Sequence, residues 1–244
     1  MMKKTVLVTG AAKRIGREIA RAFAVSGWNV VIHFNRSEME ADELLMELGG
    51  TEAGHSCVRC DFSDMRSVSA LIPSLGRPLD CLVNNASVYS RNALVDATPD
   101  ILQEVFAINF LAPFELMRSF AITMGRGCII NITDQRVSAV DPASGPYGFA
   151  KKALRDATEA AALDWAPGIR VNAVAPGIVI SPPGVPPEKM QRVIPLIPMQ
   201  TNAAPGDIAS ACLFLANSDN ITGQTLFVDG GMHLQGYPLE RKRP

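Results

Sequence analysis

The sequence predicts an α/β protein built on one doubly wound parallel sheet, with helices on both of its faces. Short β-branched apolar runs alternate with helical patterns from one end of the chain to the other. These runs are continuous and do not alternate in polarity, which is typical of a parallel sheet that is covered on both faces. No stretch has the composition of an interdomain linker, so residues 1–244 are expected to form a single domain.

The elements follow one another in a regular order. Apolar runs at residues 6–8, 30–32, 57–58, 81–83, 129–130, 170–174 and 226–228 are predicted to be buried strands. Helical patterns occupy residues 15–25, 37–48, 100–118, 147–165 and 205–217. Ser37 and Asp64 are suited to cap helix N-termini, and Pro205 suits a helix start. Right-handed crossovers then place helices on both faces of the sheet.

Composition excludes several classes of protein. Hydrophobic residues make up 48% of the chain and charged residues 19%, enough for a large core, so a disordered protein is excluded. A formal net charge of −1 gives no support for binding to nucleic acid or to a membrane surface. We expect no membrane span, since no apolar run reaches about 18 residues. Five cysteines are too few for a disulfide scaffold, which predicts a cytoplasmic protein with reduced thiols.

A segment rich in proline follows the strand predicted at 170–174. Residues 176–198 contain seven prolines, so an irregular loop or short helices are expected there. Two interpretations remain open: a stiff surface insertion, or a lid over a pocket at the carboxyl ends of the strands. Because the segment follows a strand, we favour a substrate lid at about residues 178–200.

The first strand leads into a glycine turn that opens a helix. Gly10 permits the turn, and Gly16 lies where backbone N–H groups and the helix dipole can face a pyrophosphate. The strict G-x-G-x-x-G fingerprint is absent, because Arg14 stands where a middle glycine is expected. In this strand–turn–helix context, the two glycines favour a dinucleotide cofactor.

The end of the second strand indicates which dinucleotide is bound. An NAD site would place an acidic residue there, but the sequence has Asn35, Arg36 and Ser37. Arg36 offers a bidentate fork to a 2′-phosphate, and Lys13 and Arg14 add positive charge. The alternative is that Arg36 is an ordinary exposed arginine. The missing acid and the basic pair favour NADPH over NADH.

A tyrosine and a lysine, Tyr147 and Lys151, lie four residues apart on one helix face. A nearby ammonium favours the phenolate, so Lys151 is expected to lower the pKa of Tyr147 and to make it a usable acid. Pairs at this spacing also occur by chance on helix surfaces, so other residues must support the motif. Asp134 after the strand near 129–132, and Asn109 in the helix before it, provide that support.

These motifs, in this order, resemble the short-chain dehydrogenase/reductase family over essentially the full chain. The resemblance rests on Thr9-Gly10, Asn84-Asn85-Ala86, Tyr147 with Lys151, Pro176-Gly177, Ile221-Thr222-Gly223 and residues 228–231. It implies a seven-stranded Rossmann-type sheet, and homotetramers are usual in the family. It also implies that Tyr147 is the proton donor, that Lys151 holds the nicotinamide ribose and lowers the Tyr147 pKa, that Asn109 helps to hold a water, and that Asp61 contacts adenine.

The resemblance also implies a set of residues that bind the cofactor. They are Gly10, Lys13, Arg14, Ile15, Gly16, Asn35, Arg36, Ser37, Asp61, Phe62, Asn85, Ala86, Ser87, Thr133, Tyr147, Lys151, Pro176, Gly177 and Ile178.

One departure from the family pattern narrows the substrate class. Most members have a serine thirteen residues before the tyrosine, and here that position is Asp134. Together with the Thr-Gly-Ala-Ala-Lys-Arg-x-Gly turn, the Arg-Ser pair and Asn-Asn-Ala-Ser, this aspartate resembles the pteridine reductases. In that subgroup the arginine of the turn, Arg14, reaches cofactor phosphate and pterin. Ser87 bonds cofactor and pterin, and the aromatic after it, Tyr89, stacks on the pterin. The subgroup usually has Phe there, and the alternative role for Tyr89 is a partly buried wall residue.

The sequence leaves three functions open. The leading hypothesis is an NADPH-dependent reductase of a pterin C=N bond, with Tyr147 and Asp134 supplying the proton. The second is a carbonyl reductase, for instance of a 3-oxoacyl thioester, which is disfavoured because a carboxylate would repel a developing alkoxide. The third is a regulator that senses NADP(H) without turnover, which the intact Tyr147 and Lys151 disfavour. No metal is expected, because the Cys-x-x-Cys at 57–60 lies on a predicted strand and has no second pair.

Overall fold

Seven parallel strands form one sheet in the order β3-β2-β1-β4-β5-β6-β7. The computed structural model describes residues 3–89, 91–181 and 186–235. Within them all seven predicted strands are confirmed, and the order reverses between β1 and β4, where ligands bind in such sheets. The strands are β1 (Thr5–Val8), β2 (Asn29–Phe34), β3 (Ser56–Arg59), β4 (Cys81–Asn84), β5 (Gly127–Ile132), β6 (Ile169–Pro176) and β7 (Thr225–Val228).

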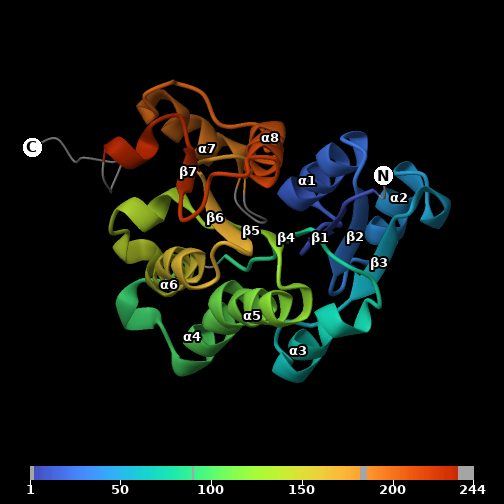
Figure 1. The fold of residues 1–244 in the computed structure, drawn as a ribbon. Helices are drawn as coiled ribbons and strands as arrows, with labels where there is room; N and C mark the ends of the chain where they lie inside the picture. Colours follow the sequence, from blue (N-terminus) through green and yellow to red (C-terminus); the bar gives the residue numbers. More distant parts are fainter. Residues whose placement is uncertain (1–2, 90, 182–185, 236–244) are drawn as a thin grey trace, which may run out of the picture.

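Helices cover both faces of the sheet, as predicted (Figure 1). One face carries α1 (Arg14–Val25), α2 (Glu38–Glu47) and α8 (Pro205–Ala216). The other carries α3 (Met65–Ser74), α4 (Pro99–Phe106), α5 (Ala112–Met124) and α6 (Gly145–Asp164).

Successive strand residues supply two separate cores. Val6 and Val8 of β1 face the core beneath α1 and α8, whereas Leu7 between them faces the core beneath α3, α5 and α6. All three side chains are fully buried. This arrangement explains why the strands read as continuous apolar runs, since both faces of each strand are covered.

The predicted helix caps differ in quality. The Asp64 carboxylate accepts a hydrogen bond from the Arg66 backbone N–H (3.0 Å) and caps α3, as predicted for Asp64, although the extent of this helix was not predicted. Ser37 occupies the N-cap position of α2, but its hydroxyl makes no capping hydrogen bond.

The helix predicted at residues 100–118 is longer and is interrupted. A π turn, Ala107–Leu111, joins α4 to α5. Pro113 follows the turn, and because proline has no N–H, a local widening of the helix accommodates it. Asn109 therefore lies in the π turn, where the backbone differs from an α-helix.

The combined stretch Pro99–Met124 is long and apolar enough to cross a membrane by length and composition alone. From the apolar runs alone we expected no segment that could span a membrane, and this stretch differs from that expectation. In the fold, 44% of the qualifying window is buried, as a helix that covers a sheet requires.

Buried amides connect the strands behind the site. Asn84 donates from Nδ2 to Oδ1 of Asn131 (2.8 Å), and Asn131 donates to the Thr158 hydroxyl (2.8 Å). These three residues come from β4, β5 and α6, and all three side chains are buried. Because both amide atoms of Asn131 are paired in this network, one to β4 and one to α6, it fixes the position of α6 relative to the sheet.

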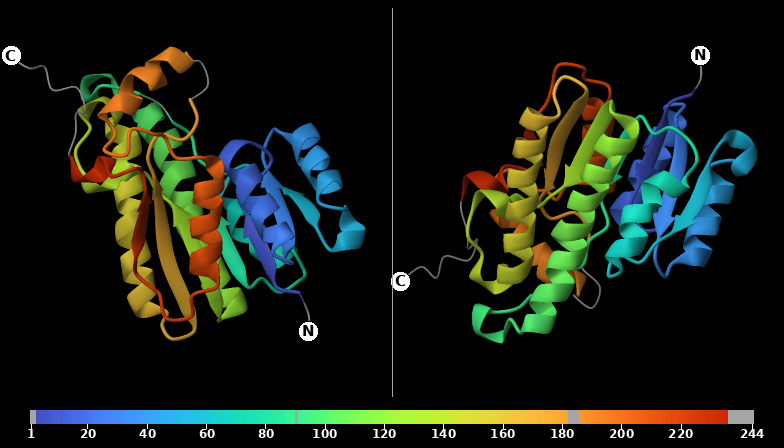
Figure 2. Two further views of the ribbon diagram at one scale, coloured as in Figure 1. Left: turned by 90° about the horizontal axis from the view of Figure 1, so that it is seen from above. Right: turned by 60° about the horizontal axis from the view of Figure 1, so that its bottom comes forward.

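The proline-rich segment lies at the carboxyl ends of the strands. It forms α7 (Pro187–Val193) and a 3₁₀ turn, Ile194–Leu196, in agreement with the predicted short helices. Figure 2 shows α7 beyond the end of β6, at the same end of the molecule as α4. Residues 182–185 of the predicted lid lie outside the described residues. Its role as a lid remains a prediction.

Candidate active site

The glycine turn after β1 is held in a conformation that glycine favours. Gly10 has φ +62° and Arg14 has φ +55°, so Arg14 adopts the left-handed geometry of the middle glycine that it replaces. A Cβ on Gly16 would lie 2.2 Å from the Gly10 carbonyl oxygen and 2.6 Å from Nδ2 of Asn85. Gly16 therefore permits a contact between helix and turn that no other residue allows.

Asn85 locks this turn from the neighbouring strand. Its Nδ2 donates to the carbonyl oxygens of Thr9 (2.9 Å) and Gly10 (3.2 Å). The Thr9 hydroxyl accepts hydrogen bonds from the backbone N–H groups of Asn85 (2.9 Å) and Ala86 (3.0 Å). The loop after β4 and the turn after β1 are thus one hydrogen-bonded unit.

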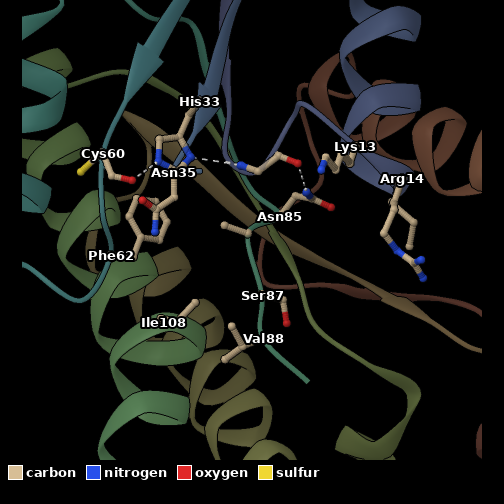
Figure 3. A pocket seen from close by; sticks show the side chains of 14 residues that line it. Lys13, Arg14, His33, Asn35, Cys60, Phe62, Asn85, Ser87, Val88 and Ile108 are labelled. Carbon is tan, nitrogen blue, oxygen red and sulfur yellow. Dashed lines mark hydrogen bonds between the residues drawn. The ribbon is translucent and has the colours of Figure 1, made fainter. Parts of the chain in front are cut away.

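His33, which the sequence patterns did not assign to the site, supports the same turn. Its Nδ1 accepts from the Gly10 N–H (3.1 Å), which leaves Nε2 as donor to the Cys60 carbonyl oxygen (3.1 Å). The ring stacks on Phe62 with centroids 4.5 Å apart. Figure 3 shows His33 and Cys60 at one side of the cavity, with Arg14 at the other. Burial lowers the pKa of His33 to about 4, so the ring is neutral at pH 7.

Two adjoining cavities, of about 350 and 360 Å³, form one groove along these loops. Both are lined by Gly10, Lys13, Asn35, Val88 and Ile108. The first contains further predicted cofactor residues: Arg14, Ile15, Gly16, Phe62, Asn85, Ala86 and Ser87. The second contains Arg36, Ser37 and Asp61. The groove also includes residues that were not predicted, namely Ala12, His33, Phe34, Cys60, Ser63, Val88, Glu104 and Ile108.

The charged end of the groove is partly neutralised. Arg36 is exposed, but Nζ of Lys13 lies 2.5 Å from Oε1 of Glu40 on α2. Asp61 accepts from the backbone N–H (2.9 Å) and hydroxyl (2.8 Å) of Ser63, and these bonds lower the pKa of Asp61. The sequence identified the cations at this end but not the acid that pairs with one of them.

Tyr147 and Asp134 meet at the carboxyl end of β5. The Tyr147 hydroxyl donates to Oδ2 of Asp134 (3.1 Å), as expected for a proton-donating pair. Lys151, one turn further along α6, donates from Nζ to the Ile132 carbonyl oxygen (2.8 Å). Both Tyr147 and Lys151 are buried.

The pKa of Tyr147 depends mainly on burial. Burial raises this pKa well above its ordinary value, the Asp134 charge raises it further, and Arg136 opposes both. The Lys151 ammonium donates to the Ile132 carbonyl oxygen, and burial lowers the pKa of Lys151 to about 8, so Lys151 keeps most of its charge at pH 7. That Lys151 lowers the pKa of Tyr147 remains a prediction.

The aromatic wall of the site is built by Tyr89. Its ring packs edge-on against Tyr147, with centroids 4.9 Å apart and an interplanar angle of 89°. The Tyr89 hydroxyl lies 3.3 Å from that of Ser144, which precedes α6. Tyr89 is 39% exposed, so one part of the ring packs on Tyr147 while the rest is open.

Ser87 and Asn109 form a second pair beside the tyrosines. The Ser87 hydroxyl donates to Oδ1 of Asn109 (2.6 Å), and Asn109 donates to the carbonyl oxygens of Val88 and Val105 (3.0 Å each). The fully buried Asn109 thus braces residues 87–88 against the π turn. Its role in holding a water remains a prediction.

The remaining predicted residues lie along the same edge. Thr133 bonds to β6 through its N–H and its hydroxyl, which reach the Val174 carbonyl oxygen at 2.8 and 3.1 Å. Gly177 follows Pro176, and a Cβ on it would lie 2.7 Å from Cα of Asp229. The Ile178 carbonyl oxygen accepts from the Ala203 N–H (3.0 Å).

Arg14 connects the glycine turn to this loop. Its guanidinium donates to the carbonyl oxygens of Ile180 (3.2 Å) and Ser181 (2.9 Å). These bonds lie across the groove from His33, so the structure places Arg14 at the mouth of the site. Its expected contacts with cofactor phosphate and pterin remain predictions.

Arg136 is a further residue of the site that the sequence patterns did not reveal. Its Nη1 lies 3.0 and 3.1 Å from the two oxygens of Asp134. An arginine two residues after the aspartate at a strand end is the signal that could have identified it.

Comparison with known proteins gives matches over nearly the whole chain. A family model described as enoyl-(acyl carrier protein) reductase matches residues 10–233. The 3-oxoacyl-[acyl-carrier-protein] reductase FabG of Staphylococcus aureus is 31% identical over 244 residues, which cover 96% of this chain and 99% of that protein. The 3beta-hydroxysteroid dehydrogenase 1 of Eggerthella lenta is 34% identical, with 96% and 95% covered.

Two solved structures share the fold closely. FolM alternative dihydrofolate reductase 1 from Brucella suis, in complex with NADP, has a TM-score of 0.89 and 31% identity, with 95% of each chain covered. The FolM alternative dihydrofolate reductase 1 from Brucella canis, also complexed with NADP, has a TM-score of 0.88 and 31% identity, with 95% of this chain and 94% of that chain covered.

The neutral His33 leads to a prediction about stability against pH. Its pKa is about 4 in the folded state against 6.5 for an ordinary histidine, so the unfolded chain binds more protons between these values. The stabilisation is fully present above pH 6.5 and is lost as the pH falls towards 4. We expect the wild-type free energy of unfolding, measured by urea denaturation from pH 7 to 4.5, to fall more steeply than that of a His33→Gln variant. Equal slopes would contradict a buried neutral imidazole.

Proposed function

The chain belongs to the short-chain dehydrogenase/reductase family, and on that premise we propose that it reduces the C=N bond of a dihydropterin or dihydrofolate with NADPH. The observation that carries this proposal is the hydrogen bond between the Tyr147 hydroxyl and Asp134. Most members of the family have a serine at the position of Asp134. The similarity to two FolM alternative dihydrofolate reductases supports the same substrate class.

The groove fits a dinucleotide that carries a 2′-phosphate. At Gly16 the turn leaves space that a Cβ would close, and the groove ends at Arg36 and Ser37. The NADP in the two solved FolM structures supports this assignment. When bound, NADPH supplies the hydride. Lys151 would hold its nicotinamide ribose, and Asp61 would contact its adenine.

Tyr147 holds the proton that the reduction requires. Hydride addition to a C=N bond leaves a nitrogen that must be protonated, and the raised pKa of Tyr147 keeps its hydroxyl protonated until then. Asp134 accepts the hydrogen bond of this phenol, and its carboxylate attracts an electron-poor N–H group. Tyr89, whose ring is partly open, would stack on the pterin.

A carbonyl reductase remains the second candidate, because the family model and the FabG of Staphylococcus aureus fit the chain equally well over most of its length. The Asp134 carboxylate disfavours it. Reduction of a ketone develops negative charge on oxygen, which a carboxylate at this position would repel. A non-catalytic NADP(H) sensor is the third candidate.

One assay panel tests these functions. NADPH oxidation is followed with dihydrobiopterin, dihydrofolate and an acetoacetyl thioester, and we expect turnover with a pterin. Tyr147→Phe should lower kcat by about 10²- to 10⁴-fold because it removes the proton donor, while the affinity for NADPH stays unchanged. Turnover with the thioester alone would refute the pterin proposal. Tight NADPH binding with no turnover on any acceptor would favour the sensor.

The charged end of the groove predicts a change of cofactor. Arg36→Asp should weaken the use of NADPH roughly 10- to 100-fold in kcat/KM, since a charge-assisted bond to the 2′-phosphate is lost, and should improve the use of NADH. Arg66→Asp, at the start of α3, serves as a control for the change of charge. An unchanged preference in Arg36→Asp would contradict the assignment of the 2′-phosphate site.

We further propose that the protein is a homotetramer of the cytoplasm. Its five free cysteines suit a reducing compartment. Among the exposed large apolar side chains, Phe114, Ile122, Phe149 and Leu163 lie on α5 and α6, and Phe214 and Leu226 lie on α8 and β7. These regions suit two different contacts between copies.

Sedimentation velocity tests this assembly. We expect the wild-type protein to sediment at the mass of four chains. Ile122→Glu should reduce it to a smaller species, because a charge would be buried in the contact. A wild-type monomer would refute the proposal.

A further inference from the structure

Arg136 lies behind the proton-donating pair and fixes one of its members. Both oxygens of the Asp134 carboxylate accept from Nη1 of Arg136, Oδ1 at 3.0 Å and Oδ2 at 3.1 Å. Oδ1 also accepts from the Arg136 backbone N–H (2.9 Å), and Oδ2 from the Tyr147 hydroxyl (3.1 Å). Because Arg136 holds both oxygens and its backbone N–H bonds only Oδ1, the carboxylate has one orientation, with Oδ2 directed to the phenol.

A second acid holds the other side of the guanidinium. Nε of Arg136 donates to Oδ2 of Asp141 (2.9 Å), whose side chain is only 6% exposed. Oδ1 of Asp141 accepts from the Ala143 N–H (3.1 Å) in the turn that leads directly into α6. Arg136 therefore links the end of β5, which carries Asp134, to the start of the helix that carries Tyr147.

The same guanidinium contacts the aromatic wall. Its central carbon lies 5.5 Å from the ring centroid of Tyr89, within the range of a cation–π interaction. Tyr89 in turn packs on Tyr147. Asp134, Tyr89 and Tyr147, three residues assigned to the substrate, are thus held together by a residue that is not itself assigned to it.

We propose that Arg136 is a positioning residue for proton delivery, which acts by orienting the Asp134 carboxylate towards Tyr147 and by fixing the substrate-facing ring of Tyr89. This proposal rests on the proposed function, in which Tyr147 and Asp134 supply the proton. Arg136 acts through these residues and not on the substrate.

The charge of Arg136 gives the proposal a second consequence. The charged and titratable groups around Tyr147 are Asp134, Arg136, Tyr89 and Lys151, and Asp141 faces Arg136 from the far side. Asp134 raises the pKa of Tyr147 and Arg136 lowers it. Without Arg136, the Asp134 charge is opposed less, so the pKa of Tyr147 rises further and the alkaline limb of the kcat profile moves to higher pH.

Four variants test this role in the full-length enzyme. Arg136→Gln should lower kcat roughly 10- to 100-fold, the size of effect that misplacement of a reacting group produces, with little change in the KM for NADPH. Arg136→Lys, which keeps the charge but not the fork, should recover part of the rate and the wild-type alkaline limb. Asp141→Asn keeps the contact between Arg136 and Asp134, so its kcat should fall less than that of Arg136→Gln. Arg21→Gln, which removes the ion pairs of Arg21 with Glu18 and Glu47, is the matched control and should have wild-type kinetics.

The outcomes separate this proposal from the proposed function. If the wild-type enzyme reduces only the thioester, the pterin assignment fails and the variants are compared on the thioester. A wild-type kcat and pH profile in Arg136→Gln would overturn the role of Arg136 with either substrate. If that variant does not fold, Arg136→Lys carries the test, and a wild-type kcat there would overturn the proposal that the guanidinium positions Asp134.

A crystal structure of Arg136→Lys gives a readout that does not depend on activity. We expect Oδ2 of Asp134 to move beyond hydrogen-bonding distance of the Tyr147 hydroxyl. An unchanged carboxylate would overturn the proposal even if no turnover is found with any acceptor.

Discussion

The common direction of the seven strands is the constraint on which the site depends. In a parallel sheet every strand ends at the same edge, so residues that follow different strands meet there although they are far apart in sequence. Gly10 follows β1, Asn85 follows β4 and Asp134 follows β5. The buried amides of Asn84 and Asn131 then bind the strands and α6 to one another directly behind this edge. The candidate site is consequently carried by buried strands that are bonded to one another and to α6.

Patterns that are local in sequence allowed most of the fold and about half of the site to be predicted. All seven strands carry a continuous apolar run, and the Tyr147–Lys151 spacing needs only one helix. Contacts between distant elements were beyond such patterns. Glu40 is on a different helix from Lys13, and His33 faces Gly10 only because β1 and β2 are neighbours. The start of α3 was predicted from its cap, Asp64, but its extent was not, because this ten-residue helix includes serines and Pro73.

Burial shifts the pKa values of Tyr147 and Lys151, both on α6, in opposite directions. It raises the pKa of Tyr147 and lowers that of Lys151, because in each case a dry environment disfavours the charged form. The pattern Tyr-x-x-x-Lys alone suggests two charges that stabilise each other. In the fold Tyr147 is neutral, Lys151 with a pKa of about 8 keeps most of its charge at pH 7, and the charges of Asp134 and Arg136 are paired beside them. The sequence indicated the candidate residues, whereas the depth at which they lie determines their protonation.

The left-handed backbone of Arg14 has a consequence for the stability of the turn. A residue with a Cβ in this conformation loses about 1 kcal/mol or more relative to glycine, which adopts it freely. Glycine at position 14 would therefore relieve the turn, but it would also remove the guanidinium that bonds the carbonyl oxygens of Ile180 and Ser181. The same side chain thus strains the turn that carries it and ties that turn to the loop after β6.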